Sequence, residues 1–138
     1  MKKLYIVTLL LPLLTLAGCA WTDEGKLVGR WGTDCVIETV TMQGGNTVSV
    51  DTMPGYSSQV VEFMDGDLCL IIDRGDTAFY HWSLNDKTLA LFREGWAEDY
   101  QVEELTRERL VYSDTYSHLD SVTGFYMFYT YTFKYNKL

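Results

Sequence analysis

Residues 77–105 read TAFYHWSLNDKTLALFREGWAEDYQVEEL, and this stretch decides the fold class. Large apolar side chains occupy alternate positions in two of its runs: Tyr80, Trp82 and Leu84 in the first, and Tyr100 and Val102 in the second. Successive side chains of a β-strand point to opposite faces of a sheet, so this alternation predicts strands with one buried face. The turn residues Asn85-Asp86-Lys87 and Gly95 separate the runs, and no helical pattern lies between them.

The same organisation extends in both directions along the chain. Short β-prone runs are separated by turn residues: 27–41, 47–53, 58–64, 68–73, 77–84, 88–93, 98–105, 109–116 and 125–135. Asp65-Gly66, between two of these runs, is one of the strongest short hairpin signals. The sequence therefore predicts an all-β protein, an antiparallel up-and-down meander that closes into a barrel of about eight strands. A β-sandwich is the alternative.

The last predicted strand, 125–135, indicates what the barrel interior contains. Its odd positions are all apolar or aromatic, so we expect them to point inward, and we expect Tyr126 and Phe128 to point outward. The inward aromatic side chains that we take as candidate lining of a ligand cavity are Tyr80, Trp82, Tyr100, Tyr129 and Tyr131. An eight-stranded barrel can hold one small ligand or be filled by its own side chains, and the sequence leaves both open.

The N-terminus has the features of a secretory signal peptide: Lys2 and Lys3, then an apolar run, then small residues. Leu16-Ala17-Gly18-Cys19 resembles the lipobox of bacterial lipoproteins. That resemblance implies cleavage before Cys19 and attachment of lipid to its sulfur, which would hold the mature protein on a membrane without spanning it. We therefore divide the chain into a signal peptide (1–18), a lipidated tether (19–26) and a β-barrel domain (27–138).

The composition limits the classes of partner. Without Lys2 and Lys3, nine basic residues face nineteen acidic ones, which gives the mature chain a net charge of −10. Such a surface repels phosphates, which argues against nucleic-acid binding. A cationic or neutral partner is compatible with this charge.

Two cysteines remain once Cys19 is assigned to lipid. Cys35 and Cys69 could form a disulfide, since the expected compartment allows such bonds. Alternatively they are free thiols that pack as small apolar side chains, the interpretation we favour, because sequence alone does not bring their Cα atoms together.

Gly29-Arg30-Trp31, at the start of the first predicted strand, resembles the Gly-x-Trp motif of lipocalins, in which the tryptophan closes one end of an eight-stranded barrel. Three later stretches look like small lipocalin-like lipoproteins of bacterial envelopes: 79–84 with 89–91, 100–106, and 109–111. The similarity covers most of residues 27–135. It implies a lipocalin-like barrel closed by Trp31. Lipocalins usually place an arginine from the last strand over this tryptophan, whereas this chain offers Lys134, with Lys137 just past the predicted strand.

Motifs of catalysis or metal binding do not emerge. Asp65-Gly66-Asp67 lacks the spacing of a calcium loop, and neither His81 nor His118 has a partner at metal-ligand spacing. Adjacent acids such as Glu98-Asp99 point to opposite faces of a strand, which favours a solvated edge over an acid–base pair. We expect no metal, no cofactor and no enzymatic activity.

Two functions fit these observations. The first is a lipid-anchored barrel of the bacterial cell envelope, on the outer membrane and facing the periplasm or the cell surface, that binds a small hydrophobic or amphipathic ligand. The second is a filled barrel that binds another protein, as an inhibitor or assembly module, through its acidic surface or an apolar patch around Tyr126 and Phe128. The identity of either partner does not follow from the sequence.

Overall fold

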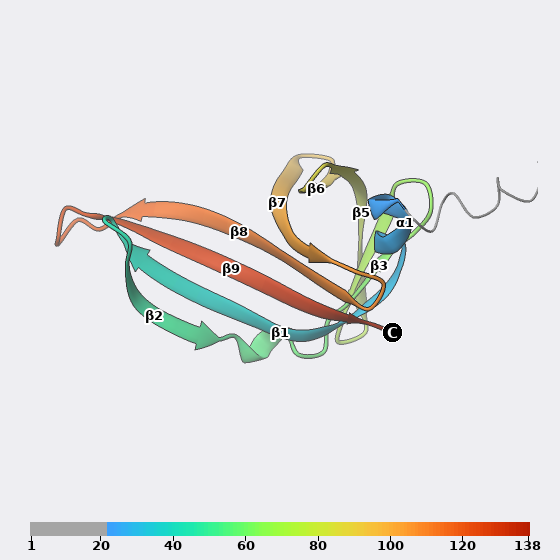
Figure 1. Ribbon diagram of the computed structural model, residues 1–138, viewed down its shortest axis with the longest axis horizontal. Coiled ribbons are helices and arrows are strands. Elements are labelled where there is room, and N and C mark those ends of the chain that lie inside the picture. The colour runs from blue at the N-terminus through green and yellow to red at the C-terminus, as the bar shows by residue number, and fades with distance from the viewer. Residues whose placement is uncertain (1–21) are drawn as a thin grey trace, which may run out of the picture.

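The computed structural model describes residues 22–138 and shows one antiparallel sheet that closes on itself (Figure 1). Its strands are β1 (Gly29–Met42), β2 (Asn46–Thr52), β3 (Val60–Phe63), β4 (Leu68–Asp73), β5 (Asp76–Asn85), β6 (Thr88–Arg93), β7 (Trp96–Leu105), β8 (Arg109–Leu119) and β9 (Tyr126–Lys137). A short helix, α1 (Asp23–Leu27), precedes them, and a single 3₁₀ turn, η2 (Pro54–Tyr56), follows β2.

The strand order establishes the barrel. The sheet runs β2-β1-β3-β4-β5-β6-β7-β8-β9, and β1 also pairs with β9. Eight strands therefore form a closed antiparallel meander, and β2 is an additional strand beside β1. The predicted all-β meander barrel is confirmed, and the alternative of a sandwich is wrong.

Tight turns connect the strands, as the sequence predicts. The hairpin between β4 and β5 turns at Arg74 and Gly75, whose φ angles are 50° and 90°. Positive φ at both central residues is what a type I′ turn requires, and its twist matches that of the flanking strands. Such turns leave no room for crossovers, so from β3 to β9 each strand is the neighbour of the next.

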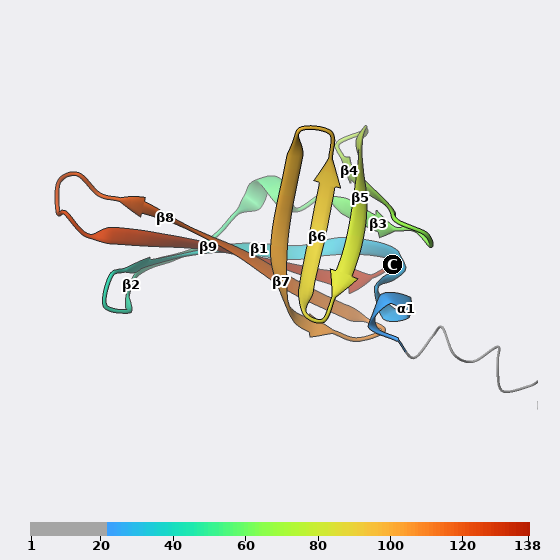
Figure 2. The ribbon, with the colours of Figure 1, turned by 90° about the horizontal axis from the view of Figure 1, so that it is seen from above.

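Three long strands, β1, β8 and β9, continue beyond the barrel and give the molecule a second part (Figures 1 and 2). β1, β8 and β9 have 14, 11 and 12 residues, whereas β3 has four and β4 six. Their far ends continue beyond the barrel together with β2 (Figures 1 and 2). We call this four-stranded extension the arm, and it comprises residues 37–42, 46–52, 114–119 and 126–131, in the order β2-β1-β9-β8.

The arm explains why the predicted inward face of the last strand does not lie wholly inside the barrel. Only the second half of β9 pairs within the barrel wall, whereas its first half belongs to the arm. Tyr126 and Phe128 are exposed, as predicted, but so is Phe125, which was expected to point inward.

Helix α1 lies on the side of the barrel from which the arm points away (Figure 1), and Trp31 packs against its last residue. Leu27 and Trp31 are both completely buried, and the indole Nε1 of Trp31 donates a hydrogen bond of 2.8 Å to the Leu27 carbonyl. Thr22 caps the helix by accepting a hydrogen bond from the Gly25 amide. Residues 23–26, expected to belong to a tether, are thus part of a helix that packs on the barrel.

Lys137 takes the place over Trp31 that the resemblance assigns to an arginine. Its Nζ lies 4.2 Å from the centroid of the Trp31 ring and donates a 2.6 Å hydrogen bond to the Val28 carbonyl. An ammonium over an indole face is a cation–π interaction. The expectation that Lys137 stands beyond the last strand is wrong, since β9 extends to this residue.

Side chains fill the closed half of the barrel. The buried cluster contains Leu27, Trp31, Val61, Phe63, Cys69, Trp82, Leu89, Leu91, Val102, Leu110, Tyr112 and Tyr135. The hydroxyl groups of Tyr112 and Tyr135 hydrogen-bond to each other at 2.9 Å, which satisfies both groups inside this apolar surrounding. This half of the barrel therefore has a packed core.

Both cysteines of the barrel domain are free thiols. Cys69 lies in β4 among the core residues and is completely buried. Cys35 precedes the fully buried Val36 in β1 and so points to the other side of the barrel wall. Because the two side chains lie on opposite sides of the wall, their sulfur atoms do not meet.

We predict that the two thiols react very differently in the folded protein. Burial raises the pKa of the Cys69 thiol to about 12, so its reactive thiolate is scarce at neutral pH. In a Cys19→Ser variant at pH 8, iodoacetamide should alkylate Cys35 at least tenfold faster than Cys69, as measured by peptide mass spectrometry. The difference should vanish in denaturant, and equal rates in the native protein would contradict the buried position of Cys69.

Candidate functional site

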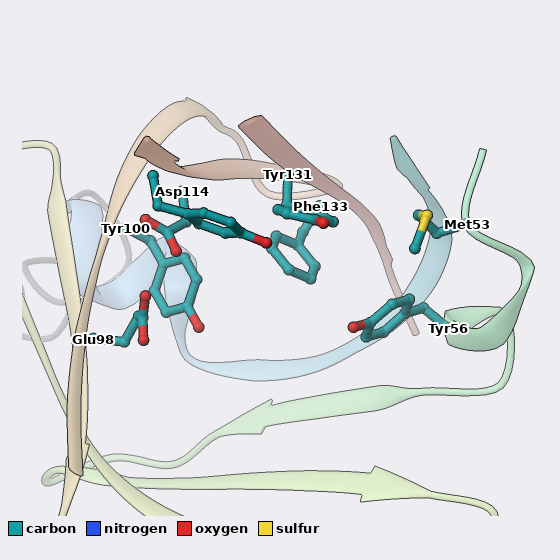
Figure 3. A pocket seen from close by; sticks show the side chains of 8 residues that line it. Met53, Tyr56, Glu98, Tyr100, Asp114, Tyr131 and Phe133 are labelled. Atoms are coloured by element: carbon teal, nitrogen blue, oxygen red, sulfur yellow. The ribbon is translucent and has the colours of Figure 1, made fainter. Parts of the chain in front are cut away.

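A cleft of about 300 Å³ opens where the arm leaves the barrel wall, since its lining includes Asp114, Tyr116 and Tyr131 of the arm beside residues of the wall. Its lining residues are Met53, Tyr56, Glu98, Tyr100, Asp114, Tyr116, Tyr131 and Phe133. Figure 3 shows Glu98, Tyr100 and Asp114 on one side, Met53 and Tyr56 on the other, and Phe133 between them. The cleft thus has an aromatic wall with two carboxyl groups at one side.

Alternation along the strands directs these side chains to the cleft. Glu98 and Tyr100 occupy alternate positions of β7, in phase with the buried Val102. Tyr131 and Phe133 of β9 are in phase with the buried Tyr135. Because the inward face of each strand continues past the packed core, its next residues line the opening.

The cleft exists because β7 and β8 separate. Their pairing ends at Gln101 and Ser113, and beyond this point β8 continues into the arm while β7 turns with the barrel. Tyr100 and Asp114 lie just past the last pair and border the cleft. They also border a second depression of about 390 Å³, whose other lining residues are Thr88, Asp99, Gln101, Ser113 and Thr115.

The aromatic rings of the cleft contact one another mainly edge to face. The Phe133 ring lies 6.0 Å from that of Tyr56 and 6.0 Å from that of Tyr100, with interplanar angles of 90° and 89°. Tyr100 also packs on the buried Tyr112, with 4.9 Å between ring centroids. Aromatic pairs prefer such arrangements, which hold the rings in place without a ligand.

A row of tyrosines continues from the cleft along the arm. Tyr116 stacks on Tyr131, with ring centroids 5.5 Å apart, and on Tyr129, with centroids 5.8 Å apart. The hydroxyl of Tyr131 donates a hydrogen bond to the Glu38 carboxylate, and this bond is the main reason why the pKa of Tyr131 is raised. These contacts fix the Tyr131 ring at the border between the cleft and the arm.

Glu98 and Asp114 form a pair of carboxyl groups at the cleft. The pKa of Glu98 is raised first by a hydrogen bond to Asp114, then by burial, and then by the negative charges of Asp114 and Asp99. Two like charges this close disfavour each other's ionisation. Within residues 22–138, neither Glu98 nor Asp114 forms an ion pair with a basic side chain.

We predict that this pair lowers the stability of the protein above acidic pH. Because the pKa of Glu98 is higher in the folded state than its ordinary value of 4.5, the folded protein binds the proton more tightly than the unfolded chain does. The free energy of unfolding should therefore fall as the pH rises from 4.5 through the raised pKa. Urea denaturation from pH 4 to 8 should show the Glu98→Gln variant more stable than the parent above this window and no more stable below it. The same stability difference at all pH values would contradict the prediction.

The open rim of the barrel carries a further aromatic group. Tyr80 packs edge to face on Trp96, with ring centroids 5.2 Å apart, and the Arg93 guanidinium carbon lies 4.8 Å from the centre of the Tyr80 ring. Arg93 is thus a basic residue of the rim whose partner is an aromatic ring.

The structure brings two of the five predicted lining residues together at the cleft, Tyr100 and Tyr131. Tyr80 lies at the rim, and Tyr129 lies on the arm. Trp82 belongs to the packed core, donates its indole N–H to the Met64 carbonyl at 3.1 Å, and borders a small depression of about 120 Å³ beside α1. A ligand-binding role for each of the five stays a prediction.

Sequence reasoning did not assign six of the eight lining residues to a site. Glu98 and Phe133 share the inward face of a predicted strand with Tyr100 and Tyr131, so alternation was a sufficient signal for both. The sequence suggests a solvated edge for Glu98 because its neighbour Asp99 points to the opposite face. Its actual partner is Asp114 of β8, which is distant in the sequence. Met53 and Tyr56 come from the η2 turn and its flank, where no pattern in the sequence indicated a contribution.

Within residues 22–138, no three metal-ligating side chains are close enough to hold a metal ion. The helices in this part of the chain are also too short or too polar to span a bilayer. The predicted lipidation site, Cys19, lies outside the described residues.

The comparisons with known proteins add no relative. No protein-family model, no curated protein and no solved structure matches this chain. The barrel has the shape of a lipocalin-like fold, and the cleft itself is the feature from which a function can be inferred.

Proposed function

We propose that this protein is a non-enzymatic binding protein of the bacterial envelope, anchored through lipid on Cys19, that holds a small amphipathic molecule at the open end of its barrel. The observation that carries the proposal is the cleft of about 300 Å³ with rings from β7, β8, β9 and η2. Binding sites for small molecules are concave and carry polar groups that orient the ligand. The cleft combines aromatic walls with the carboxyl groups of Glu98 and Asp114.

The position of the cleft favours a ligand that arrives from the aqueous side. Only three residue steps separate Cys19 from Thr22, which is roughly 11 Å when fully extended. An anchor at Cys19 would therefore keep α1 near the membrane, and the arm points away from α1 (Figure 1). The cleft is lined by Asp114 and Tyr131, whose strands continue into the arm. The packed core fills the part of the barrel around Trp31 and Trp82, and the cleft lies outside this core.

The proposal is tested on the lipidated protein isolated gently from its own membrane. Native mass spectrometry should detect a bound small molecule at about one per chain, and denaturation should release it for identification. A Tyr100→Ser variant that still folds should carry less of it, whereas a Tyr126→Ser variant, changed on the arm, should carry as much as the parent. Release of the same molecule in equal amount from both variants would place the ligand elsewhere and contradict the proposal.

The arm favours a second function, the binding of a protein with a basic surface. Most of the exposed large apolar side chains in residues 22–138 lie on or beside the strands of the arm. They are Val48, Val50, Tyr116, Leu119, Val122, Phe125, Tyr126 and Phe128. Leu119, Tyr126 and Phe128 share one face of the arm, whereas Tyr116 points to the other. A small protein that exposes an apolar patch commonly uses it for interaction. The net charge of −10 in the mature chain would attract a basic partner.

This second function predicts a stoichiometric complex that weakens as salt rises. Replacement of Val122 and Tyr126 by serine should abolish the complex on size-exclusion chromatography, whereas Trp96→Ser at the barrel rim should not. A complex that survives the arm substitutions would count against this use of the arm.

A further inference from the structure

We propose that the cleft selects a ligand with a protonated amine, an ammonium group joined to a short apolar chain, and that Glu98 and Asp114 bind the ammonium while the rings contact the chain. This inference rests on the proposed function, since it names the chemical class of the ligand that the same cleft would hold. It excludes fatty acids and other anions, which the general proposal allows.

The aromatic wall is the first reason. The rings of Tyr56 and Tyr100 each stand nearly perpendicular to that of Phe133, so the cleft presents both ring faces and ring edges. A ring face carries negative charge density and attracts a cation within about 6 Å. The same rings offer apolar area to methylene groups.

The two carboxyl groups are the second and stronger reason. Each is partly buried at the cleft, and within residues 22–138 neither has a basic partner. Two adjacent carboxyl groups without a cation destabilise a fold, because partial burial raises the cost of their charges. An ammonium donates up to three hydrogen bonds and would supply the missing positive charge between them.

The surroundings of the pair do not offer a competing cation. The groups that face Glu98 are Asp114 from β8, Asp99 and Tyr100 from β7, and Tyr56 from η2, and none of them is basic. Arg93 at the rim lies over Tyr80, and its guanidinium is in no ion pair among the described residues. Arg93 also shows that an aromatic ring at this end of the barrel takes a cation as its partner.

Proton linkage gives the proposal a signature beyond affinity. An ammonium stabilises the ionised form of Glu98, so ligand binding should lower the raised pKa of this group and release protons. Affinity for the amine should therefore increase as the pH rises through the range in which Glu98 loses its proton. Uptake of protons on binding would have the opposite sign.

The test compares three probes with the same eight-carbon chain: octylammonium, octanol and octanoate. Isothermal titration calorimetry on the folded Cys19→Ser protein at pH 7, in two buffers of different ionisation enthalpy, measures affinity and proton release together. We expect octylammonium to bind at least tenfold more tightly than octanol, and octanoate to bind more weakly than both. Glu98→Gln and Asp114→Asn should each weaken octylammonium binding at least fivefold and leave octanol binding unchanged.

Glu103→Gln is the matched control, since it removes the same charge from an exposed position on β7 outside the cleft. It should bind octylammonium like the parent, whereas an equal loss in Glu98→Gln and Glu103→Gln would show only an effect of net charge and overturn the inference. If octanol or octanoate binds as tightly as octylammonium, the ammonium selectivity is wrong while the binding barrel stands. If none of the three probes binds, the ammonium inference fails; the native mass spectrum then decides the proposed function separately.

Discussion

Replacing Trp31 by alanine is expected to lower the free energy of unfolding by about 3–5 kcal/mol, the range for removal of a large buried aromatic side chain. Trp31 is completely buried beneath α1. Its indole N–H donates a hydrogen bond of 2.8 Å to the Leu27 carbonyl, and Lys137 lies over its ring. The substitution therefore removes core volume, the hydrogen bond to the helix and the surface that supports the lysine. Since domains of this size are stable by about 5–15 kcal/mol, the variant should be near the limit of folding.

The measurement is urea denaturation followed by circular dichroism, with Trp96→Ala as the control. Trp96 lies at the open rim, is 36% exposed and packs mainly on Tyr80, so its loss should cost far less than that of Trp31. Equal losses for the two variants would contradict the importance that burial, the bond to Leu27 and the contact with Lys137 give to Trp31.

Replacing Gly29 by alanine is expected to lower the free energy of unfolding by about 2–3 kcal/mol, because the alanine would be unfavourable in two ways, through its backbone conformation and through a steric clash. Its φ angle is 130°, a conformation that residues with a Cβ rarely adopt. A Cβ atom would also lie 2.6 Å from the Nζ of Lys137, so the lysine would have to leave its place over Trp31.

Two further variants separate the penalties by their free energies of unfolding. Gly44 has a φ of 102°, but no other side chain or backbone segment lies within 4 Å of the place that a Cβ would take, so Gly44→Ala measures the backbone penalty nearly alone. In a Lys137→Ala background, Gly29→Ala should lose most of its steric component and cost about as much as Gly44→Ala. If Gly29→Ala lowers the free energy of unfolding equally with and without Lys137, a clash with the lysine is not the reason why position 29 requires glycine.

Alternation and turn residues were sufficient to predict the barrel, because a meander of hairpins leaves few other ways to bury one face of every strand. The hairpins at Asp65-Gly66 and Arg74-Gly75 illustrate this, since each turn makes the next strand a neighbour of the last. The arm was not predictable on the same basis. Tyr129 and Phe133 continue one alternating pattern, yet the first lies on the arm and the second in the barrel. Where a barrel wall ends depends on pairing with other strands, which the pattern within one strand does not encode.

In the candidate site, too, some residues could be predicted from the pattern within one strand, and others depend on how the strands pair. Tyr100 and Tyr131 followed from alternation within their strands, and both line the cleft. The juxtaposition of Glu98 and Asp114 depends on how far β7 stays paired with β8 before the two separate. Tyr56 reaches the cleft from a turn, so only the three-dimensional path of the chain reveals its contribution.

The pairing of β1 with β9 has a consequence for the time course of folding. Trp31 pairs with Lys137, so the barrel closes only when the two ends of the domain find each other. Contacts between residues so distant in sequence give a high contact order, and all-β domains of this kind fold in milliseconds to seconds rather than microseconds. Until that pairing forms, β1 and β9 present unpaired edges that invite aggregation. We therefore expect the final residues of the chain to limit the folding rate, so that loss of even a short C-terminal segment leaves an open, aggregation-prone sheet.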